Sequence, residues 1–193
     1  MSVHDYPVAS IPWPRALTWA REELDHYLEA ASDPALQPLP TRCPPWTVHD
    51  LTAHLACSFE RFADMLGKSR AGDLEPPFPP HHLAAENLRA VAAFTGDPLQ
   101  ALREQAGRFL DAVDDPVEPM AHQLGPIPAG LQVMFGLNEL AVHHDDLAQA
   151  AGRSRRPPEE IVTALAAMYG AVFGLPDGLD LWTRLLQATG RPG

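Results

Sequence analysis

Apolar positions recur at helical spacing along most of the 193-residue chain, and no stretch shows the alternation of a β-strand. This pattern predicts four long helices at about residues 13–31, 47–67, 83–113 and 129–151, the third interrupted at residues 95–98 (Thr-Gly-Asp-Pro). Two shorter helices are expected at about 159–173 and 179–187, and the proline-rich residues 71–80 predict an extended crossover. The fold class is therefore all-α, a four-helix bundle with short C-terminal helices.

Local signals support the helix boundaries. Thr47 is a favourable N-cap with Asp50 three residues later, and Trp46 and Leu51 have the spacing of a hydrophobic staple. Gly152 suits the end of the fourth long helix, because glycine commonly follows a helix C-terminus. These signals predict that residues 47–67 and 129–151 are well-defined helices.

The helix at 129–151 carries polar groups where apolar ones belong. Residues four apart on a helix differ by about 40° around its axis, so Glu139 and His143 share one face, and Asp146 returns to it. His144 points about 140° away from Glu139. A buried carboxylate must be paired or bound to metal, and a Glu and a His one turn apart suit a divalent transition metal. The alternative is a solvated or purely structural pair.

A third candidate ligand lies on the helix at 47–67. His54 is at the edge of the apolar arc of that helix, about 60° from Leu51, and alone it is best interpreted as a core histidine. In a four-helix bundle, however, metal sites form from inward side chains on facing helices. Together, His54, Glu139 and His143 would supply two imidazoles and one carboxylate. Such a set leaves room for water or substrate, as in catalytic zinc and non-haem iron sites.

Composition narrows the classes of partner. The formal net charge is −11 with only 14 basic residues and no basic cluster, which argues against nucleic acid or an anionic membrane as a partner. Two cysteines, Cys43 and Cys57, form no CxxC pair and predict no disulfide framework. Residues 1–10 lack the features of a signal peptide, and no apolar run approaches the roughly 20 residues of a membrane helix. We therefore expect a cytoplasmic protein, either a monomer or a homodimer.

Two motifs resemble those of a known family. Residues 43–55 (CPPWTVHDLTAHL) resemble the pattern C-P-x-W-T-V-x-D-L-x-x-H-L, and residues 139–147 (ELAVHHDDL) resemble E-L-x-V-H-x-x-D-L. Both patterns are typical of the mycothiol-dependent maleylpyruvate isomerase-like family in the DinB/YfiT metal-binding superfamily. The resemblance covers about residues 10–152. It implies a DinB-like bundle whose metal ligands, usually to zinc, are His54, Glu139 and His143.

The resemblance also shapes the expected domain organisation. We expect one DinB-like helical bundle domain over residues 1–193, with a core at about 10–152 and a C-terminal helical appendage at 153–193. The characterised isomerase carries a second, α+β domain after its bundle, whereas only about 40 residues follow the bundle here. The resemblance therefore implies the bundle and the metal site more strongly than isomerisation of maleylpyruvate.

The sequence thus predicts a divalent-metal-dependent enzyme, with Zn²⁺ the best candidate. It would use a low-molecular-weight thiol such as mycothiol for S-transfer to, or isomerisation of, a small electrophile. Asp146 is expected to orient a ligand imidazole or to form a salt bridge, and Phe135 and Val142 to line an apolar pocket. Cys43 is expected to be a small buried residue rather than a nucleophile. A metal-dependent hydrolase and a non-catalytic metal-binding or ligand-binding bundle remain the alternatives.

Overall fold

The structure is a computed structural model that describes residues 12–178 and 180–191. The segment in which the sequence shows no signal peptide, residues 1–10, lies outside the described residues, as does residue 179 at the start of the last predicted helix.

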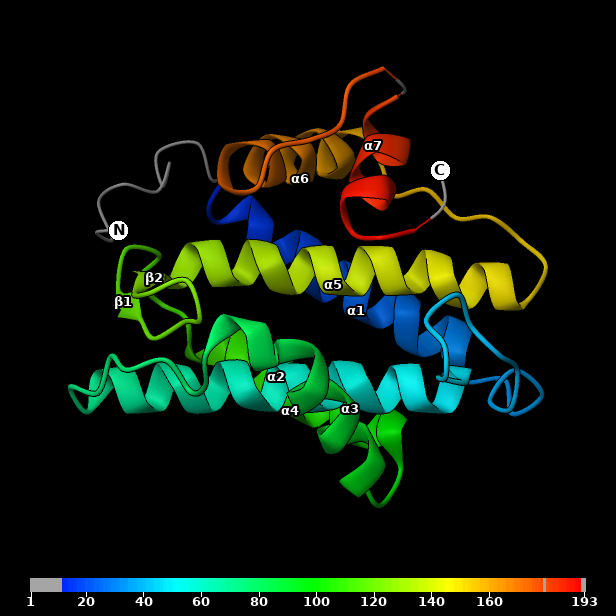
Figure 1. Ribbon diagram of the computed structural model, residues 1–193, viewed down its shortest axis with the longest axis horizontal. Helices are drawn as coiled ribbons and strands as arrows, with labels where there is room; N and C mark the ends of the chain where they lie inside the picture. The colour runs from blue at the N-terminus through cyan, green and yellow to red at the C-terminus, as the bar shows by residue number, and fades with distance from the viewer. Residues whose placement is uncertain (1–11, 179, 192–193) are drawn as a thin grey trace.

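The described chain is predominantly helical, as the apolar pattern predicts (Figure 1). The α-helices are α1 (Arg15–Ala31), α2 (Val48–Arg70), α3 (Leu83–Ala93), α4 (Pro98–Ala112), α5 (Ala129–Ala150), α6 (Glu159–Val172) and α7 (Leu181–Ala188). A short 3₁₀ helix, η3 (Pro80–His82), precedes α3. Among the described helices, none combines enough length with enough hydropathy for a bilayer span.

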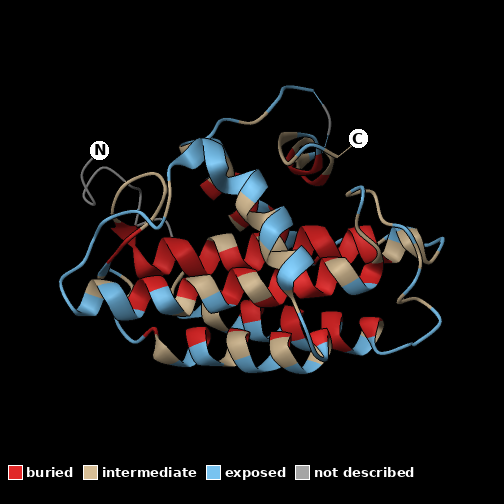
Figure 2. Cartoon of the chain, turned by 60° about the horizontal axis from the view of Figure 1, so that its bottom comes forward, coloured by how far each residue is buried: buried red, intermediate tan, exposed pale blue. Residues whose placement is uncertain are grey.

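Four of these helices form the bundle. α2 packs against α4 and α1 against α5, and α2 also contacts α5 (Figure 1). Their buried residues lie on the helix faces that turn toward one another (Figure 2). α6 and α7 lie on one side of the bundle, beyond α5 in the view of Figure 1. The DinB-like four-helix bundle with short C-terminal helices is therefore confirmed.

The third predicted helix is in fact two helices, α3 and α4, and only α4 contributes buried residues to the core. Asp97 caps α4 by accepting hydrogen bonds from Leu99 N and Gln100 N, as expected from the predicted interruption. α4 buries an apolar face in the bundle, whereas α3 has no buried residue. Only the second half of the predicted helix therefore belongs to the four-helix core.

The segment between the third and fourth predicted helices contains a short antiparallel pair of strands, although the sequence shows no strand-like alternation there. Two strands, β1 (Pro119–Met120) and β2 (Ile127–Pro128), pair antiparallel with Met120 opposite Ile127. Strands of two residues are too short to show alternation, so the apolar pattern could not reveal them. The segment also supplies the start of α5, because carbonyls of Glu118 and Pro116 accept the N–H groups of Ala129 and Gly130.

The start of α2 is fixed by the predicted capping box. Thr47 Oγ1 accepts the N–H of Asp50, and Asp50 Oδ2 accepts the N–H of Thr47 at 3.0 Å. Reciprocal capping satisfies two backbone donors at the helix end. It thereby fixes the helical register of His54, which follows in the second turn.

α2 and α5 approach closely at a glycine. A Cβ atom on Gly136 would lie 3.1 Å from Cε1 and 3.2 Å from Cζ of Phe59 on α2. Phe59 is fully buried and its ring also contacts those of Phe62 and Phe109. Gly136 precedes Glu139 by one turn, so this contact sets the spacing of the two helices beside the candidate site.

Candidate metal centre

The three predicted ligands converge in the bundle from two helices. His54 comes from α2, and Glu139 and His143 lie one turn apart on α5. Glu139 Oε2 lies 3.3 Å from His54 Nε2 and 3.4 Å from His143 Nε2. The ligand atoms of all three residues lie within 4.8 Å of one another. Both histidines are buried, whereas the Glu139 side chain keeps 34% exposure.

The spacing and chemistry of these groups fit a divalent metal. Separations of 3.3 and 3.4 Å are long for N–H···O hydrogen bonds, whose usual length is about 2.9–3.0 Å. Two ligands bonded to a tetrahedral zinc at about 2.0–2.1 Å would lie about 3.3–3.4 Å apart. Two imidazoles with one carboxylate are also a common donor set for catalytic zinc. The residues present therefore fit the group that the sequence predicts.

The surroundings of His54 favour its neutral imidazole form. Its ring stacks on Trp46 with centroids 4.7 Å apart, and it meets the His143 ring edge-on at 5.1 Å. Burial lowers the pKa of His54 below its usual value, despite the opposing effect of Glu139. A neutral imidazole is the form that binds metal, so the environment of His54 suits a ligand.

His143 is oriented by Asp146. His143 Nδ1 donates to Asp146 Oδ2 at 2.9 Å, which turns Nε2 toward Glu139. Burial alone would lower the pKa of His143, but hydrogen bonds with Asp146, Cys43 and Glu139 hold it well above its usual value. A carboxylate that holds the distal ring proton is the usual support for a metal-binding histidine.

Asp146 is fully buried and receives several donors. Arg42 approaches Oδ1 with Nη2 at 2.9 Å, and Arg191 Nη2 donates to Oδ2 at 2.7 Å. Burial would raise the pKa of Asp146, but the bonds from His143 and Arg191 hold it well below the usual range. Asp146 therefore orients an imidazole and forms buried salt bridges at once, so the two roles considered for it coexist.

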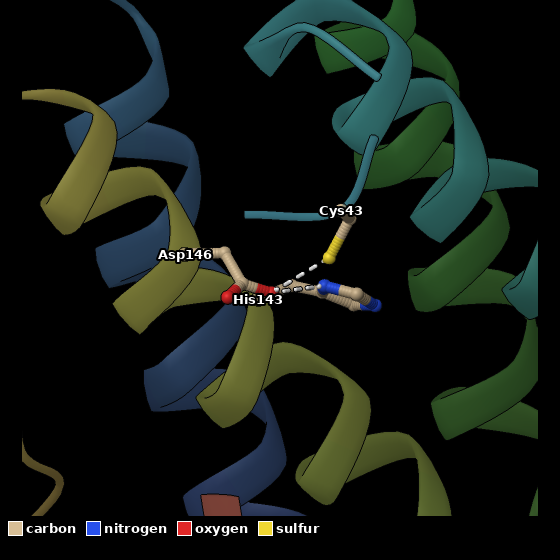
Figure 3. A group of neighbouring side chains, drawn as sticks. All are labelled: Cys43, His143 and Asp146. Carbon is tan, nitrogen blue, oxygen red and sulfur yellow. Dashed lines mark hydrogen bonds and ion pairs between the residues drawn. The ribbon is translucent and has the colours of Figure 1, made fainter. Parts of the chain in front are cut away.

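Cys43 completes the surroundings of this carboxylate (Figure 3). Its thiol lies 3.3 Å from Asp146 Oδ2 and 3.3 Å from Arg191 Nη2, and it is only partly buried. The interpretation of Cys43 as a small buried residue is therefore corrected, because the loop before α2 turns the thiol toward α5.

Cys43, His143 and Asp146 form a second group with metal-ligand chemistry (Figure 3). Two guanidinium groups, those of Arg42 and Arg191, already contact Asp146. A metal cation there would face both positive charges, and His143 Nδ1 is committed to Asp146. The group of His54, Glu139 and His143 is therefore the better candidate for a metal centre.

His144 points away from this centre, as its helical position predicts. Its Nδ1 lies 2.8 Å from Glu23 Oε1, and the other oxygen of Glu23 is bonded by Arg155. Glu23 and His144 are both buried, so the network ties α1 to α5 and to the segment before α6. His81 and His82 are exposed in η3, away from these buried contacts.

An apolar cavity of about 330 Å³ lies beside the candidate centre. Phe135 and Val142 line it, as predicted, and Glu139 contributes its exposed part. His122 stacks on Phe135 with centroids 5.5 Å apart. The three candidate ligands therefore lie at the wall of a small-molecule-sized cavity rather than in a closed structural site.

Several site residues could not be found from spacing. Arg42 lies in the loop before α2, and Arg191 follows α7, more than 40 residues beyond Asp146. Arg61, which also lines the cavity, is the exception. It lies seven residues after His54 and so shares the face of α2 that carries His54. That spacing was available in the sequence, but an arginine at a helix surface carries no distinctive chemistry by itself.

A bundle that directs two imidazoles and a carboxylate at one cavity defines a DinB-like helical bundle protein. Residues 17–148 match the family described as mycothiol maleylpyruvate isomerase N-terminal domain, and the chain belongs to this family. Two uncharacterized proteins of Mycobacterium tuberculosis, from strains CDC 1551 and H37Rv, are each 32% identical to it over 136 residues. Those alignments cover 69% of this chain and 65% of each relative, just under two thirds of their length.

Solved structures show the same fold. The crystal structure of a mycothiol-dependent maleylpyruvate isomerase superposes with a TM-score of 0.61 at 22% identity, covering 86% of this chain and 71% of that one. A histidine-to-alanine mutant of a mycothiol-dependent maleylpyruvate isomerase gives the same TM-score at 21% identity. At this level of identity the similarity shows the fold.

Proposed function

We propose that the protein is a divalent-metal-dependent enzyme, with zinc the preferred metal. In this proposal it uses a low-molecular-weight thiol, mycothiol, for S-transfer to or isomerisation of a small electrophile. The observation that carries the proposal is the convergence of His54, Glu139 and His143 at the wall of an apolar cavity. Membership of a family named for mycothiol maleylpyruvate isomerase supports the choice of thiol.

The proposed ligands leave a position for the thiol. His54, Glu139 and His143 would hold the metal through three protein groups, which is the number typical of catalytic sites with an open position. When bound, zinc supplies a Lewis acid that lowers the pKa of a coordinated thiol.

The remaining residues support that chemistry from outside. Asp146 holds the Nδ1 proton of His143 and fixes its ring, and Arg42 and Arg191 keep Asp146 charged. The apolar wall that includes Phe135 and Val142 keeps water away and the local dielectric low, which favours a thiolate held near positive charge.

For an electrophile with an activated double bond, the proposed step is an addition. The thiol gives up its proton, its sulfur forms a bond to one carbon, and the electrons of the double bond take up a proton at the other carbon. Isomerisation follows if the single bond rotates and the thiol then leaves with re-formation of the double bond.

We also propose that the bundle core and the C-terminal helices work as one domain. Arg191, which follows α7, forms a salt bridge of 2.7 Å with Asp146 on α5. A residue from the C-terminal appendage thereby contacts Asp146, which orients the proposed metal ligand His143.

The test is thiol consumption by protein incubated with zinc. Wild type and His143→Ala are incubated with mycothiol and a panel of small electrophiles, with His144→Ala as the matched control. Consumption should exceed the uncatalysed rate for wild type and His144→Ala, and should fall to that rate for His143→Ala. Equal rates for all three proteins across the panel would refute the thiol-dependent activity, and metal-dependent ester hydrolysis without thiol would favour a hydrolase.

A further inference from the structure

An arginine in the wall of the cavity has no acidic partner among the residues that the structure describes. Arg61 Nη2 donates to Asn87 Oδ1 at 2.8 Å and approaches Ser58 Oγ at 3.4 Å. Within residues 12–178 and 180–191, its Nε and Nη1 atoms have no hydrogen-bond partner, and no carboxylate lies within 4.0 Å of the guanidinium. Arg42 and Arg191, by contrast, both pair with Asp146.

The guanidinium of Arg61 is held in place by its neighbours. Phe78 covers it, with the Arg61 Cζ 5.4 Å from the ring centroid, and Asn87 holds Nη2 from α3. α3 has no buried residue and so adds nothing to the hydrophobic core. Its Asn87 instead holds the guanidinium of Arg61 at the cavity wall. An arginine restrained in this way loses little freedom when it binds a ligand.

The charge of Arg61 is only partly compensated. Burial lowers the pKa of Arg61 below its usual range, which reports partial removal of the guanidinium from water. The carboxylate that also lines the cavity, Glu139, is engaged with His54 and His143. Glu139 and Glu86 act on Arg61 from a distance, but neither carboxylate contacts it. A partly desolvated cation without a contacting counter-ion favours binding of an anion, because pairing offsets its loss of hydration.

Two amide side chains add unused hydrogen-bonding capacity to the same cavity. Gln132 and Asn138 line it, and their exposed fractions are 1% and 5%. In the described part of the chain, Gln132 Oε1 and Asn138 Oδ1 have no hydrogen-bond partner. Buried acceptors are normally satisfied, so these two oxygens mark polar groups at the cavity that the described residues leave unpaired.

We propose that Arg61 forms a carboxylate-binding subsite of this cavity and selects ligands with one carboxylate on an apolar body. A single negative charge matches one unpaired guanidinium beside the negative Glu139 better than a dianion does. The apolar residues of the cavity, among them Phe62, Phe135 and Val142, would contact the body of the ligand. That this ligand is the electrophilic substrate rests on the proposed function, whereas its binding to Arg61 requires neither metal nor thiol.

The test uses chelator-treated protein without thiol, so that a carboxylate cannot bind through a metal. Trans-cinnamate carries one carboxylate on an apolar body, and cinnamamide is its neutral counterpart of nearly the same shape. Their affinities are measured by calorimetry for wild type, Arg61→Gln and Arg108→Gln. Arg108 is the control, since it is an exposed arginine of α4 that pairs with Asp64 and does not line the cavity.

Wild type should bind cinnamate about tenfold or more tightly than cinnamamide, because a charge-assisted hydrogen bond replaces a neutral one. Arg61→Gln should remove that preference and leave cinnamamide binding within about twofold, whereas Arg108→Gln should retain it. Equal affinities of wild type for the two probes, or equal behaviour of the two variants, would overturn the proposal.

A second variant keeps the test independent of the folding of Arg61→Gln. Asn87→Ala removes the bond that holds the guanidinium, and α3 buries no residue, so the bundle should fold normally. Its cinnamate affinity should fall while its cinnamamide affinity does not. Because neither metal nor thiol is present, loss of thiol chemistry elsewhere would leave this result unaffected.

Discussion

Adjacent histidines on α5 should respond in opposite ways to the same substitution. His143→Ala removes a proposed metal ligand, whereas His144→Ala removes a partner of Glu23 on the other side of the helix. We expect His144→Ala to retain one zinc per chain with lowered stability, and His143→Ala to lose zinc. The two residues share burial and chemistry, so each variant is the control for the other.

The structural contribution of His144 can be worked from its contacts. Truncation removes a 2.8 Å bond to Glu23, which is 1% exposed and would keep Arg155 as its remaining partner. Loss of a bond to a charged group and the resulting void together cost about 2–4 kcal/mol of unfolding free energy. For a domain of this size, this lowers Tm by about 5–15 °C.

Zinc provides the second measurement. A ligand at about 100 times its Kd stabilises the folded state by about 2.7 kcal/mol, which corresponds to a rise in Tm of about 5–10 °C. Chelator-treated wild type and His144→Ala should show this rise on addition of zinc, and His143→Ala should not. Thermal melting and elemental analysis of the same samples supply both readouts.

The opposite pattern would refute the assigned register and the metal centre. If His144→Ala lost zinc as completely as His143→Ala, the two side chains would not lie on different sides of α5 as the structure has them. If His143→Ala retained one zinc per chain and still melted at a higher temperature with zinc, His143 would not be the third ligand beside His54 and Glu139.

Three further outcomes follow from the same geometry. Asp146→Asn should weaken zinc binding about 10–100-fold without changing its stoichiometry, because the hydrogen bond that orients His143 is weakened. Competition with a chromogenic chelator would measure this affinity, and an unchanged affinity would exclude an orienting role for Asp146. Burial lowers the pKa of His122 to about 4, and its neutral Nδ1 accepts the N–H of Leu124. The contribution of His122 to the unfolding free energy is therefore complete above about pH 6.5. It is lost, by up to about 3 kcal/mol, as the pH falls toward 4. His122→Asn should therefore show a shallower decline in urea-unfolding free energy between pH 7 and 4.5, and parallel declines would contradict this. Thr47→Ala should lower the unfolding free energy by about 1 kcal/mol through loss of the helix cap, and an unchanged Tm would show that the cap contributes nothing.

Much of the site could be predicted because helical periodicity fixes it. The spacing of Glu139, His143 and His144 determines which of them share a face, and the capping box at Thr47 fixes the register of His54. Once a four-helix bundle is inferred, these inward groups must meet other helices. The structure brings His54, Glu139 and His143 together, and their binding of metal remains a prediction.

The rest depends on long-range placement that no local pattern encodes. Arg42 and Arg191 reach Asp146 from a loop and from the end of α7, where side-chain direction does not follow helical spacing. The two-residue strands at 119–128 are too short to alternate, and α3 has an apolar composition without a buried face. Tertiary contacts, rather than local propensity, decide each of these features.

The close approach at Gly136 links the packing of the hydrophobic core to the geometry of the proposed metal centre. A methyl group there would meet Phe59 at 3.1 Å, and because Phe59 is itself enclosed by Phe62 and Phe109, the helices rather than the ring would have to give way. A shift of a few tenths of an ångström exceeds the tolerance of about 0.2 Å within which metal–ligand distances normally fall. At the proposed metal centre, the affinity for metal and the preference between metals of different radius would therefore depend on core residues that do not contact the ion.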